Sequence, residues 1–359
     1  MRRTLLFASL TLASSSAWAI INGTPVDWPS HDNLVRLDGH PMSGGVIQDK
    51  KGQCTGTLIS GKYVLTAAHC LDKENVVDSV TMASGQNTST EFAQYRMHPN
   101  YDPSADFSTD VGLIPLNQVL VHQSIQFFSD LSISNISKGE AINVKGFGGT
   151  ATASSPLNQA EFTFSKTHWA SPELIYIDVV NDSHTTGGDS GSAWSNDMNE
   201  IIGVHNGSSF NFTTNKRSTY GTDLHYASDF ILETINGWHY PTIANANGQT
   251  TITIQSLHQS VNQPDPSNEM WTEGDVALVN EASSCFNQAL SPYKKCTLVV
   301  ESQGAEGVIW LSANEAIYIN KPIKQPEGGS SSSASGASFG FWSLLVLAGL
   351  AWGRRRQWK

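Results

Sequence analysis

Thr185-Thr186-Gly187-Gly188-Asp189-Ser190-Gly191-Ser192 places a serine between glycines and directly after an acid. Serine is a weak nucleophile unless a base takes its proton and an oxyanion site receives the developing charge. Glycines let a backbone turn tightly and approach a substrate carbonyl closely. The N–H groups of Gly188 and Ser190 are therefore candidate oxyanion donors. A turn of this composition is also typical of a surface loop, so its meaning depends on the rest of the chain.

Two further segments offer the partners that such a serine needs. His69 ends the run Leu65-Thr66-Ala67-Ala68-His69 and precedes Cys70, which makes it a candidate base. Asp110 opens the apolar run from residue 111 to 116, which makes it a candidate acid at the start of a strand. Each has an ordinary alternative, because a lone histidine can be a packed core residue and an acid at a strand edge can be a solvated turn residue.

Strand-length apolar runs separated by turn residues favour an all-β barrel or sandwich. The clearest runs cover residues 34–37, 54–60, 63–66, 111–116, 141–144 and 201–204. One helical pattern interrupts them: Ala227, Phe230, Ile231 and Ile235 recur at helical spacing, and Gly237 stands where a terminating glycine is expected.

The first nineteen residues, 1–19, have the layout of a secretory signal peptide. Arg2 and Arg3 provide the charged start, a short apolar run follows, and Ala17-Trp18-Ala19 is a small-residue cleavage site. Four cysteines fit the oxidising compartment that such a signal implies. They allow three disulfide connectivities, of which the local one is preferred: Cys54 with Cys70, and Cys285 with Cys296.

The formal charge is −11. Many of the basic residues lie at the two ends, so the folded middle is more acidic still. This charge argues against nucleic acid or an anionic membrane surface as a partner of the folded part. No spacing of cysteine, histidine or acids suggests a metal, and we expect no cofactor.

Taken together, the T-A-A-H-C, D-V-G-L-I-P-L and G-D-S-G segments resemble the chymotrypsin/trypsin-like serine proteases. The order His, Asp, Ser is that family's order, and residues 20–23 match its I-I-N-G start. The resemblance covers residues 20–240 and implies two six-stranded β-barrels with a C-terminal helix. It also implies that Ser190 is the nucleophile, His69 its base and Asp110 the orienter of that base, with an oxyanion hole at Gly188 and Ser190.

The same resemblance implies an activation step. In the family, a new N-terminal isoleucine ammonium folds inward and pairs with the acid before the catalytic serine, here Asp189. Ile20 directly follows the signal cleavage site. Signal peptidase itself is therefore expected to release the activating amine, with no zymogen stage or a very short one.

The substrate pocket departs from that of ordinary trypsin. His184 stands where an acid would select arginine or lysine, and His205-Asn206-Gly207 replaces the usual Ser-Trp. The T-T-G-G turn and a histidine fifteen residues after the nucleophile resemble bacterial glutamyl endopeptidases. That likeness implies that Thr185 and His205, with Ser208, bind a substrate carboxylate. The alternative is that His205 is a packed strand residue and the pocket takes small side chains.

Beyond residue 240 the character of the chain changes. Residues 241–322 hold several short strands and suggest a small β-sandwich, residues 323–338 form a Gly/Ser-rich linker, and residues 339–359 are apolar before an Arg cluster. This layout resembles the GlyGly-CTERM sorting tails of Gram-negative secreted proteins. It implies a membrane-held tail that a rhomboid-type protease removes, and delivery by secretion machinery to the cell surface or medium.

The sequence therefore predicts an exported serine endopeptidase that acts on protein or peptide substrates. The rival from another class is a catalytically inactive, protease-like binding module or adhesin. An α/β-hydrolase is disfavoured because its G-x-S-x-G motif is not met: Ser192 occupies the place of the last glycine.

Overall fold

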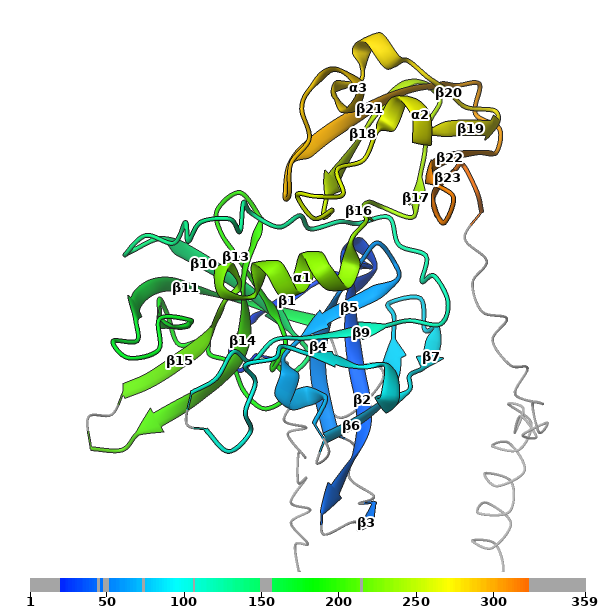
Figure 1. Ribbon diagram of the computed structural model, residues 1–359. Coiled ribbons are helices and arrows are strands. Elements are labelled where there is room, and N and C mark those ends of the chain that lie inside the picture. The colour runs from blue at the N-terminus through cyan, green and yellow to red at the C-terminus, as the bar shows by residue number, and fades with distance from the viewer. Residues whose placement is uncertain are drawn as a thin grey trace, which may run out of the picture. The chain divides into compact units, whose positions relative to one another are not determined.

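The computed structural model describes residues 20–43, 46–47, 52–72, 75–105, 107–148, 157–213 and 216–322. These residues are mostly β-structure and belong to one compact unit (Figure 1). The predicted signal peptide, the predicted linker and the predicted sorting segment lie outside the described residues. Among the described residues, no helix combines the length and the apolar character that a membrane crossing needs.

A closed six-stranded barrel carries the serine-containing turn. Its strands follow the order β11-β10-β13-β14-β15-β12, and β12 pairs back to β11 to close it, while β1 (Thr24–Val26) adds to β11. Alternate side chains point inward from β10 and β11, where they pack around Trp194. The barrel strands are β10 (Ala141–Gly146), β11 (Leu157–Thr167), β12 (Leu174–Val179), β13 (Ala193–Ser195), β14 (Ile201–Asn211) and β15 (Lys216–Asp223).

A second, eight-stranded sheet forms a half-barrel that carries the candidate base and acid. It runs along the open path β7-β6-β2-β4-β5-β9-β8, with β3 beside β2. The predicted all-β, trypsin-like class is thus confirmed as one closed barrel and one half-barrel. Its strands are β2 (Leu34–Ser43), β3 (Val46–Ile47), β4 (Gly52–Ile59), β5 (Tyr63–Thr66), β6 (Asn75–Thr81), β7 (Asn87–Ser89), β8 (Arg96–Met97) and β9 (Gly112–Pro115).

The predicted helix forms as α1 (Ser228–Ile235), and its apolar face joins the core of the half-barrel through Ile231 and Ile235. The residue that ends it is Asn236, with a left-handed φ of 39°, rather than Gly237. Gly237 lies close to another group: a Cβ atom there would be 2.5 Å from a Glu315 carboxylate oxygen, so a larger residue would require the Glu315 side chain to shift. Short 3-10 turns lie at η1 (Trp28–His31), η2 (Ala68–Cys70), η3 (Phe92–Gln94), η4 (Leu224–Ala227) and η5 (Asn280–Ala282).

The last part of the described chain forms two four-stranded sheets around one shared core. The orders are β16-β18-β21-β20 and β17-β23-β22-β19, and the sandwich begins at β16, slightly before residue 241. Cys285–Cys296 joins α3 to β21, so both predicted disulfides are present. The elements are β16 (Trp238–His239), β17 (Ile243–Ala244), β18 (Gly248–Ser256), α2 (Pro266–Glu269), β19 (Trp271–Gly274), β20 (Ala277–Leu278), α3 (Ser284–Asn287), β21 (Lys295–Ser302), β22 (Gly307–Ser312) and β23 (Glu315–Ile319).

Hydrogen bonds connect the sandwich to the strands and loops before it. The Gln255 side chain accepts from the Phe128 N–H at 3.0 Å and donates to the Phe128 carbonyl at 2.8 Å. The Tyr293 hydroxyl donates to the Ser228 carbonyl at the start of α1, at 2.9 Å. The sandwich thus supplies partners to backbone groups outside its own sheets.

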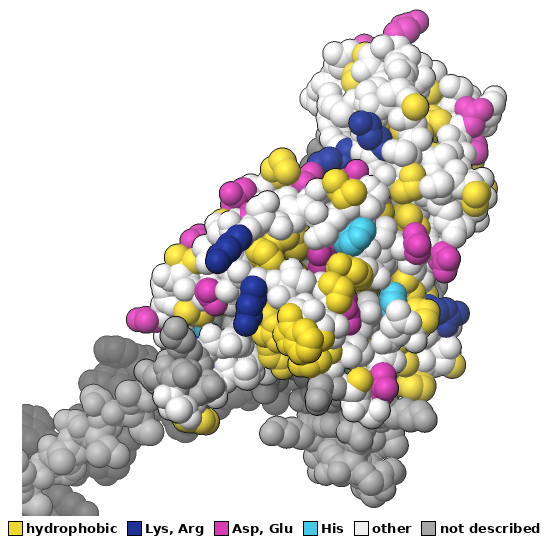
Figure 2. Space-filling view, turned by 60° about the vertical axis from the view of Figure 1, so that its left-hand side comes forward, with side chains coloured by type: hydrophobic (Ala, Val, Ile, Leu, Met, Phe, Trp, Pro, Cys, Tyr) yellow, Lys and Arg dark blue, Asp and Glu magenta, His cyan; other side chains and the backbone are white. Residues whose placement is uncertain are grey.

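The face in Figure 2 carries few lysine and arginine side chains, and they are scattered among acidic ones. A nucleic-acid-binding face instead gathers basic side chains into a patch or stripe. The face shown there offers no such stripe.

Candidate active site

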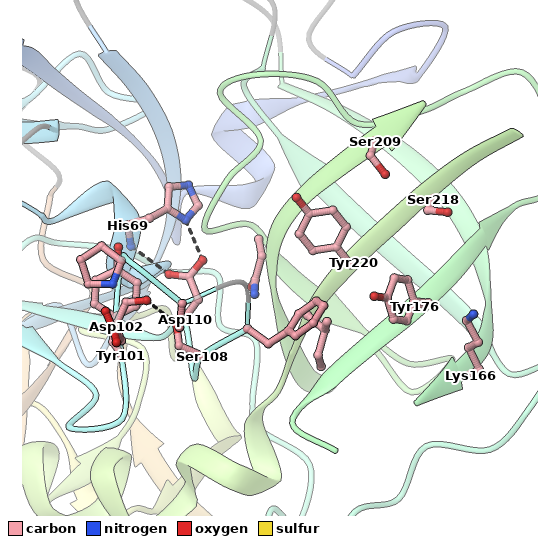
Figure 3. Close-up of a pocket in the computed structure, with 15 residues that line it drawn as sticks. His69, Tyr101, Asp102, Ser108, Asp110, Lys166, Tyr176, Ser209, Ser218 and Tyr220 are labelled. Carbon is pink, nitrogen blue, oxygen red and sulfur yellow. Dashed lines mark hydrogen bonds and ion pairs between the residues drawn. The ribbon is translucent and has the colours of Figure 1, made fainter. Parts of the chain in front are cut away.

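The candidate base and acid come together because their strands are neighbours. His69 lies in the turn η2 after β5, Asp110 lies just before β9, and β5 and β9 pair with Thr66 opposite Gly112. The Asp110 carboxylate accepts the backbone N–H of His69 at 2.8 Å and contacts its Nδ1 at 2.7 Å (Figure 3). This network assigns the proton to Nδ1 and leaves Nε2 as an acceptor.

The surroundings of His69 alter its basicity. Burial alone lowers the pKa of the imidazole, but the hydrogen bond and the negative charge of Asp110, with a further contribution from Asp72, raise it more. The net pKa therefore lies above 6.5. A raised pKa makes His69 a stronger proton acceptor than a free imidazole and extends its protonated form to higher pH.

We expect the activity on a neutral peptide to fall at acid pH with a midpoint above 6.5, because protonated His69 cannot accept a proton. Asp110→Asn should move that midpoint downward, since the charge that stabilises the imidazolium is gone. Asp102→Asn is the control, because Asp102 lines the same cavity and no hydrogen bond joins it to His69 in the described structure. A pH profile of kcat/KM measures all three, and a wild-type midpoint below 6.5 contradicts the assignment.

The serine-containing turn is fixed to the half-barrel by Thr55 of β4. Its N–H donates to the Ser190 carbonyl at 2.8 Å, and its hydroxyl donates to the Gly188 carbonyl at 2.9 Å. Gly191 has φ +83°, and a Cβ atom there would overlap Thr66 Oγ1 and the Thr55 carbonyl. Glycine is therefore required at this position.

A disulfide links the strand of Thr55, which anchors the turn, to the segment of the candidate base. Thr55 follows Cys54, whose disulfide partner Cys70 follows His69. The bond to Thr55 and the disulfide therefore hold Ser190 and His69 in one site. Cys54, His69 and Cys70 place ligand-type atoms within 4.8 Å of one another. Because both sulfurs are in the disulfide, they are not the thiolates that a metal needs.

The Ser190 side chain donates to the Asn206 carbonyl at 3.4 Å and makes no hydrogen bond to His69 in the described structure. Catalytic hydrogen bonds in proteins without substrate are often long or absent and tighten on binding. Within the described part of the chain, the N–H groups of Gly188 and Ser190 donate to no other group. Two unused donors beside a serine are what an oxyanion hole requires.

Asp189 is fully buried under this turn. Its carboxylate accepts the N–H groups of Gly148 and Thr186, both at 2.8 Å, and packs directly against Gly146 and Gly148. Burial raises the pKa of Asp189 to about 7, although the two N–H donors work in the opposite direction. No cation among the described residues pairs with it.

Ile20 approaches the same strand from the other end of the chain. Its side chain is fully buried in the core of the closed barrel, together with Ile142 and Val144 of β10. Asp189 packs against Gly146 at the end of β10. In the full chain the Ile20 nitrogen is a peptide nitrogen, so the predicted ion pair requires cleavage before Ile20.

The structure brings three of the four predicted pocket residues together. Ser208 donates to the Thr185 carbonyl at 3.3 Å, and its neighbour on β14, His205, lies on the same face of the strand pair. His184 is partly exposed; its N–H donates to the Ile21 carbonyl at 3.0 Å, and its Nδ1 lies 3.2 Å from the Asp182 carbonyl. Residues three apart on a regular strand point to opposite faces of the sheet. The bulge between His205 and Gly207 adds one residue, so the side chains of His205 and Ser208 lie on the same face.

Thr219 joins this group and was not predicted. It lies opposite Ser208 on β15, and its hydroxyl is buried without a hydrogen-bond partner in the described structure. The same is true of Thr185 Oγ1 and His205 Nδ1. Buried polar atoms are normally satisfied, so these three atoms make the region a candidate site for a polar group of a ligand. Thr219 is recognised as a member of this group only from the pairing of β14 with β15, which the sequence alone does not reveal.

A cavity of about 720 Å³ opens beside His69 and Asp110. Figure 3 shows Tyr176, Tyr220 and Lys166 across it from the candidate base, on strands of the closed barrel. The Lys166 ammonium lies 5.1 Å from the centre of the Tyr176 ring. These lining residues are also unpredicted, because they reach the cavity only through the pairing of distant strands.

Known proteins share parts of this sequence and its fold. A family model described as Trypsin matches residues 36–231. Serine protease snk of Drosophila melanogaster is 33% identical over 107 residues, which are 28% of this chain and 24% of that protein. Snake venom serine protease 3 of Protobothrops jerdonii is 30% identical over 151 residues, 41% of this chain and 55% of that protein. The chain thus spans about a quarter to about half the length of these two curated relatives.

Among solved structures, the VesB protease of Vibrio cholerae aligns over 84% of this chain and 100% of its own, with 18% identity and a TM-score of 0.46. This likeness concerns the fold alone.

Proposed function

Because the chain belongs to the trypsin family, we propose that it is a serine endopeptidase that works through an acyl-enzyme. One observation carries the proposal: His69 is bonded to Asp110 through Nδ1, beside a turn in which two backbone N–H groups next to Ser190 are unused. Nucleophile, base, orienter and oxyanion donors are then present in one place.

In the proposed reaction, Ser190 Oγ attacks the substrate carbonyl carbon and its proton passes to Nε2 of His69. The carbonyl oxygen becomes an oxyanion that accepts the N–H groups of Gly188 and Ser190. When the carbon–nitrogen bond breaks, His69 returns the proton to the leaving amine. Water then attacks the ester carbonyl while His69 takes a proton from it. His69 returns this proton to Ser190 Oγ when the ester bond breaks, which releases the acid product and frees Ser190.

A fluorophosphonate probe separates this proposal from the inactive binding module. The probe bonds only to an activated serine, so the processed protein should be labelled at Ser190. A processed protein that starts at Ile20 and takes no label favours the binding module instead.

The substrate pocket supports a preference for glutamate, or aspartate, before the scissile bond. Thr185 and Ser208 offer hydroxyls and His205 an imidazole, and all three types donate hydrogen bonds to a carboxylate. Thr185 Oγ1 and His205 Nδ1 are buried without a hydrogen-bond partner in the described structure, which supports this proposal.

We therefore expect a peptide with glutamate before the scissile bond to be cleaved at least tenfold faster, in kcat/KM, than its glutamine twin. A tenfold factor needs only about 1.4 kcal/mol, less than one good charge-assisted hydrogen bond supplies. His205→Ala should collapse this ratio while the glutamine peptide is less affected.

His184→Ala is the matched control, because the hydrogen bonds of this histidine go to Ile21 and Asp182 rather than to Thr185, His205 or Ser208. The glutamate-to-glutamine ratio of this variant should stay at the wild-type value. Equal rates on glutamate and glutamine peptides, or strong cleavage after arginine or lysine, would rule out the acidic preference.

We also propose export through the inner membrane and sorting by the tail, which rest on the sequence at both ends. A chain truncated before Phe339 should show no membrane-held form, because the apolar segment it lacks is the candidate stop-transfer signal. Mass spectrometry of the mature protein should find an end between residues 328 and 337. Protein from the medium that still carries Lys359 contradicts tail processing.

A further inference from the structure

Arg217 on β15 lies next to the proposed substrate pocket. It pairs with Phe210 of β14, and its guanidinium carbon lies 5.7 Å from the centre of the Phe210 ring. Its Nη1 donates to the Ser208 hydroxyl at 3.3 Å. Ser208 in turn donates to the Thr185 carbonyl. A short run of contacts therefore joins this cation to the pocket wall.

The strand register places Arg217 on the pocket side of the sheet. Ser208 lies opposite Thr219, and Phe210 lies opposite Arg217, two residues further along each strand. Because alternate residues of a strand share a face, Arg217 points to the same side as the orphan hydroxyl of Thr219. The guanidinium reaches back along this face, over Phe210, toward Ser208.

The groups inside the pocket supply hydrogen bonds but no charge. Thr185, Ser208 and Thr219 are hydroxyls. Burial, with a smaller effect of His69, lowers the pKa of His205 to about 3, so its ring carries no charge at neutral pH. A carboxylate that leaves water needs an opposite charge as well as hydrogen bonds.

Arg217 carries a positive charge, and the described structure shows no ion pair for it. In the part of the chain that the structure describes, no carboxylate lies within ion-pair distance of it. This is notable in a chain whose formal charge is −11. The side chain is partly exposed, so an incoming ligand can reach it. A guanidinium offers two parallel donors that fit a carboxylate.

We propose that Arg217 is a specificity-determining residue that attracts and pairs with the carboxylate of the substrate residue bound against Thr185, His205 and Ser208. This inference rests on the proposed endopeptidase function and deepens its acidic preference. Arg217 touches the substrate side chain and takes no part in bond breaking.

The test compares Arg217→Gln with the wild type on matched glutamate and glutamine peptides, with active enzyme counted by fluorophosphonate labelling. The glutamate advantage in kcat/KM should fall at least tenfold, through KM more than kcat, while the glutamine peptide changes less than twofold. Added salt should reduce the advantage in the wild type and leave the variant unaffected, because screening acts on the lost charge.

Two further variants keep the test sharp. Arg217→Lys should retain part of the advantage, since it keeps the charge and loses the fork. Lys166→Gln removes another cation that lines the active-site cavity and should leave the ratio unchanged. An unchanged ratio in Arg217→Gln, or an equal loss in Lys166→Gln, overturns the proposal. Failure of the wild type to take label or cleave either peptide is a different result, and it refutes the endopeptidase function itself.

Discussion

Replacing Ser190 by alanine should lower kcat by several powers of ten and leave the fold intact. The loss of one triad member removes the whole covalent route, and what remains is on the order of a 10³-fold acceleration over water from binding and the oxyanion donors. The Ser190 side chain makes one long hydrogen bond, to Asn206, so its removal should hardly affect stability.

Ser192→Ala is the matched control, because Ser192 lies two residues away in the same turn and its buried hydroxyl has no partner in the described structure. It should stay within about tenfold of wild-type activity, since it removes one orphan hydroxyl. Peptide hydrolysis at fixed protein concentration and a thermal melt measure both variants. Near wild-type hydrolysis by pure Ser190→Ala protein would remove the proposed mechanism.

The second large effect concerns Asp189 and the amine that cleavage before Ile20 releases. In the processed enzyme, Asp189→Asn should lower activity by a factor on the order of 10²–10³. Removing one partner of a buried ion pair leaves the other charge uncompensated, at a cost of about 3–5 kcal/mol. The Ser190 turn, which Asp189 holds through the Thr186 N–H, would lose its order at the same time.

A pH series distinguishes the precursor from the processed chain. In the precursor, the folded pKa of Asp189 is raised from 3.8 to about 7. This acid therefore stabilises the fold when protonated, and the contribution is lost as pH rises through about 7, at about 1.4 kcal/mol per pH unit between the two values. In the processed chain the ammonium should lower this pKa, so stability should instead hold at neutral pH and fall toward acid.

Urea titrations at pH 5 and pH 8 compare a protein that starts at Ile20 with one that keeps a residue before it. N-terminal sequencing of the exported protein shows which form occurs. A start at Trp18 or earlier with latent activity contradicts activation by signal peptidase, and so does full activity in a processed Asp189→Ala protein.

Local patterns predicted the elements that carry their own signal. The runs around residues 63–66 and 111–116 became β5 and β9, and the helical spacing from residue 227 to 235 became α1. The pairing of His69 with Asp110 also follows from short motifs, because each ends or opens one of those strands. These features depend on residues that are adjacent in the chain, so they can be predicted from the sequence.

The residues that the sequence did not identify depend on strand register. Thr219 and Arg217 belong to the candidate site only because they lie opposite Ser208 and Phe210 on the neighbouring strand. The helix ends where the pattern predicts, but Asn236 rather than Gly237 takes the left-handed conformation, and Gly237 lies against the Glu315 carboxylate. His184 stands at the family position by residue count, yet its hydrogen bonds in the described structure go to Ile21 and Asp182 and not to the other predicted pocket residues.

The side-chain amide of Gln255 in the sandwich forms hydrogen bonds with both the N–H and the carbonyl of Phe128, as a neighbouring strand would do. The same amide also donates to the Tyr293 carbonyl at 2.8 Å. Without the sandwich, the N–H and the carbonyl of Phe128 would lose these partners. We therefore expect a chain shortened before β16 to be less stable than one that keeps residues 20–322 together.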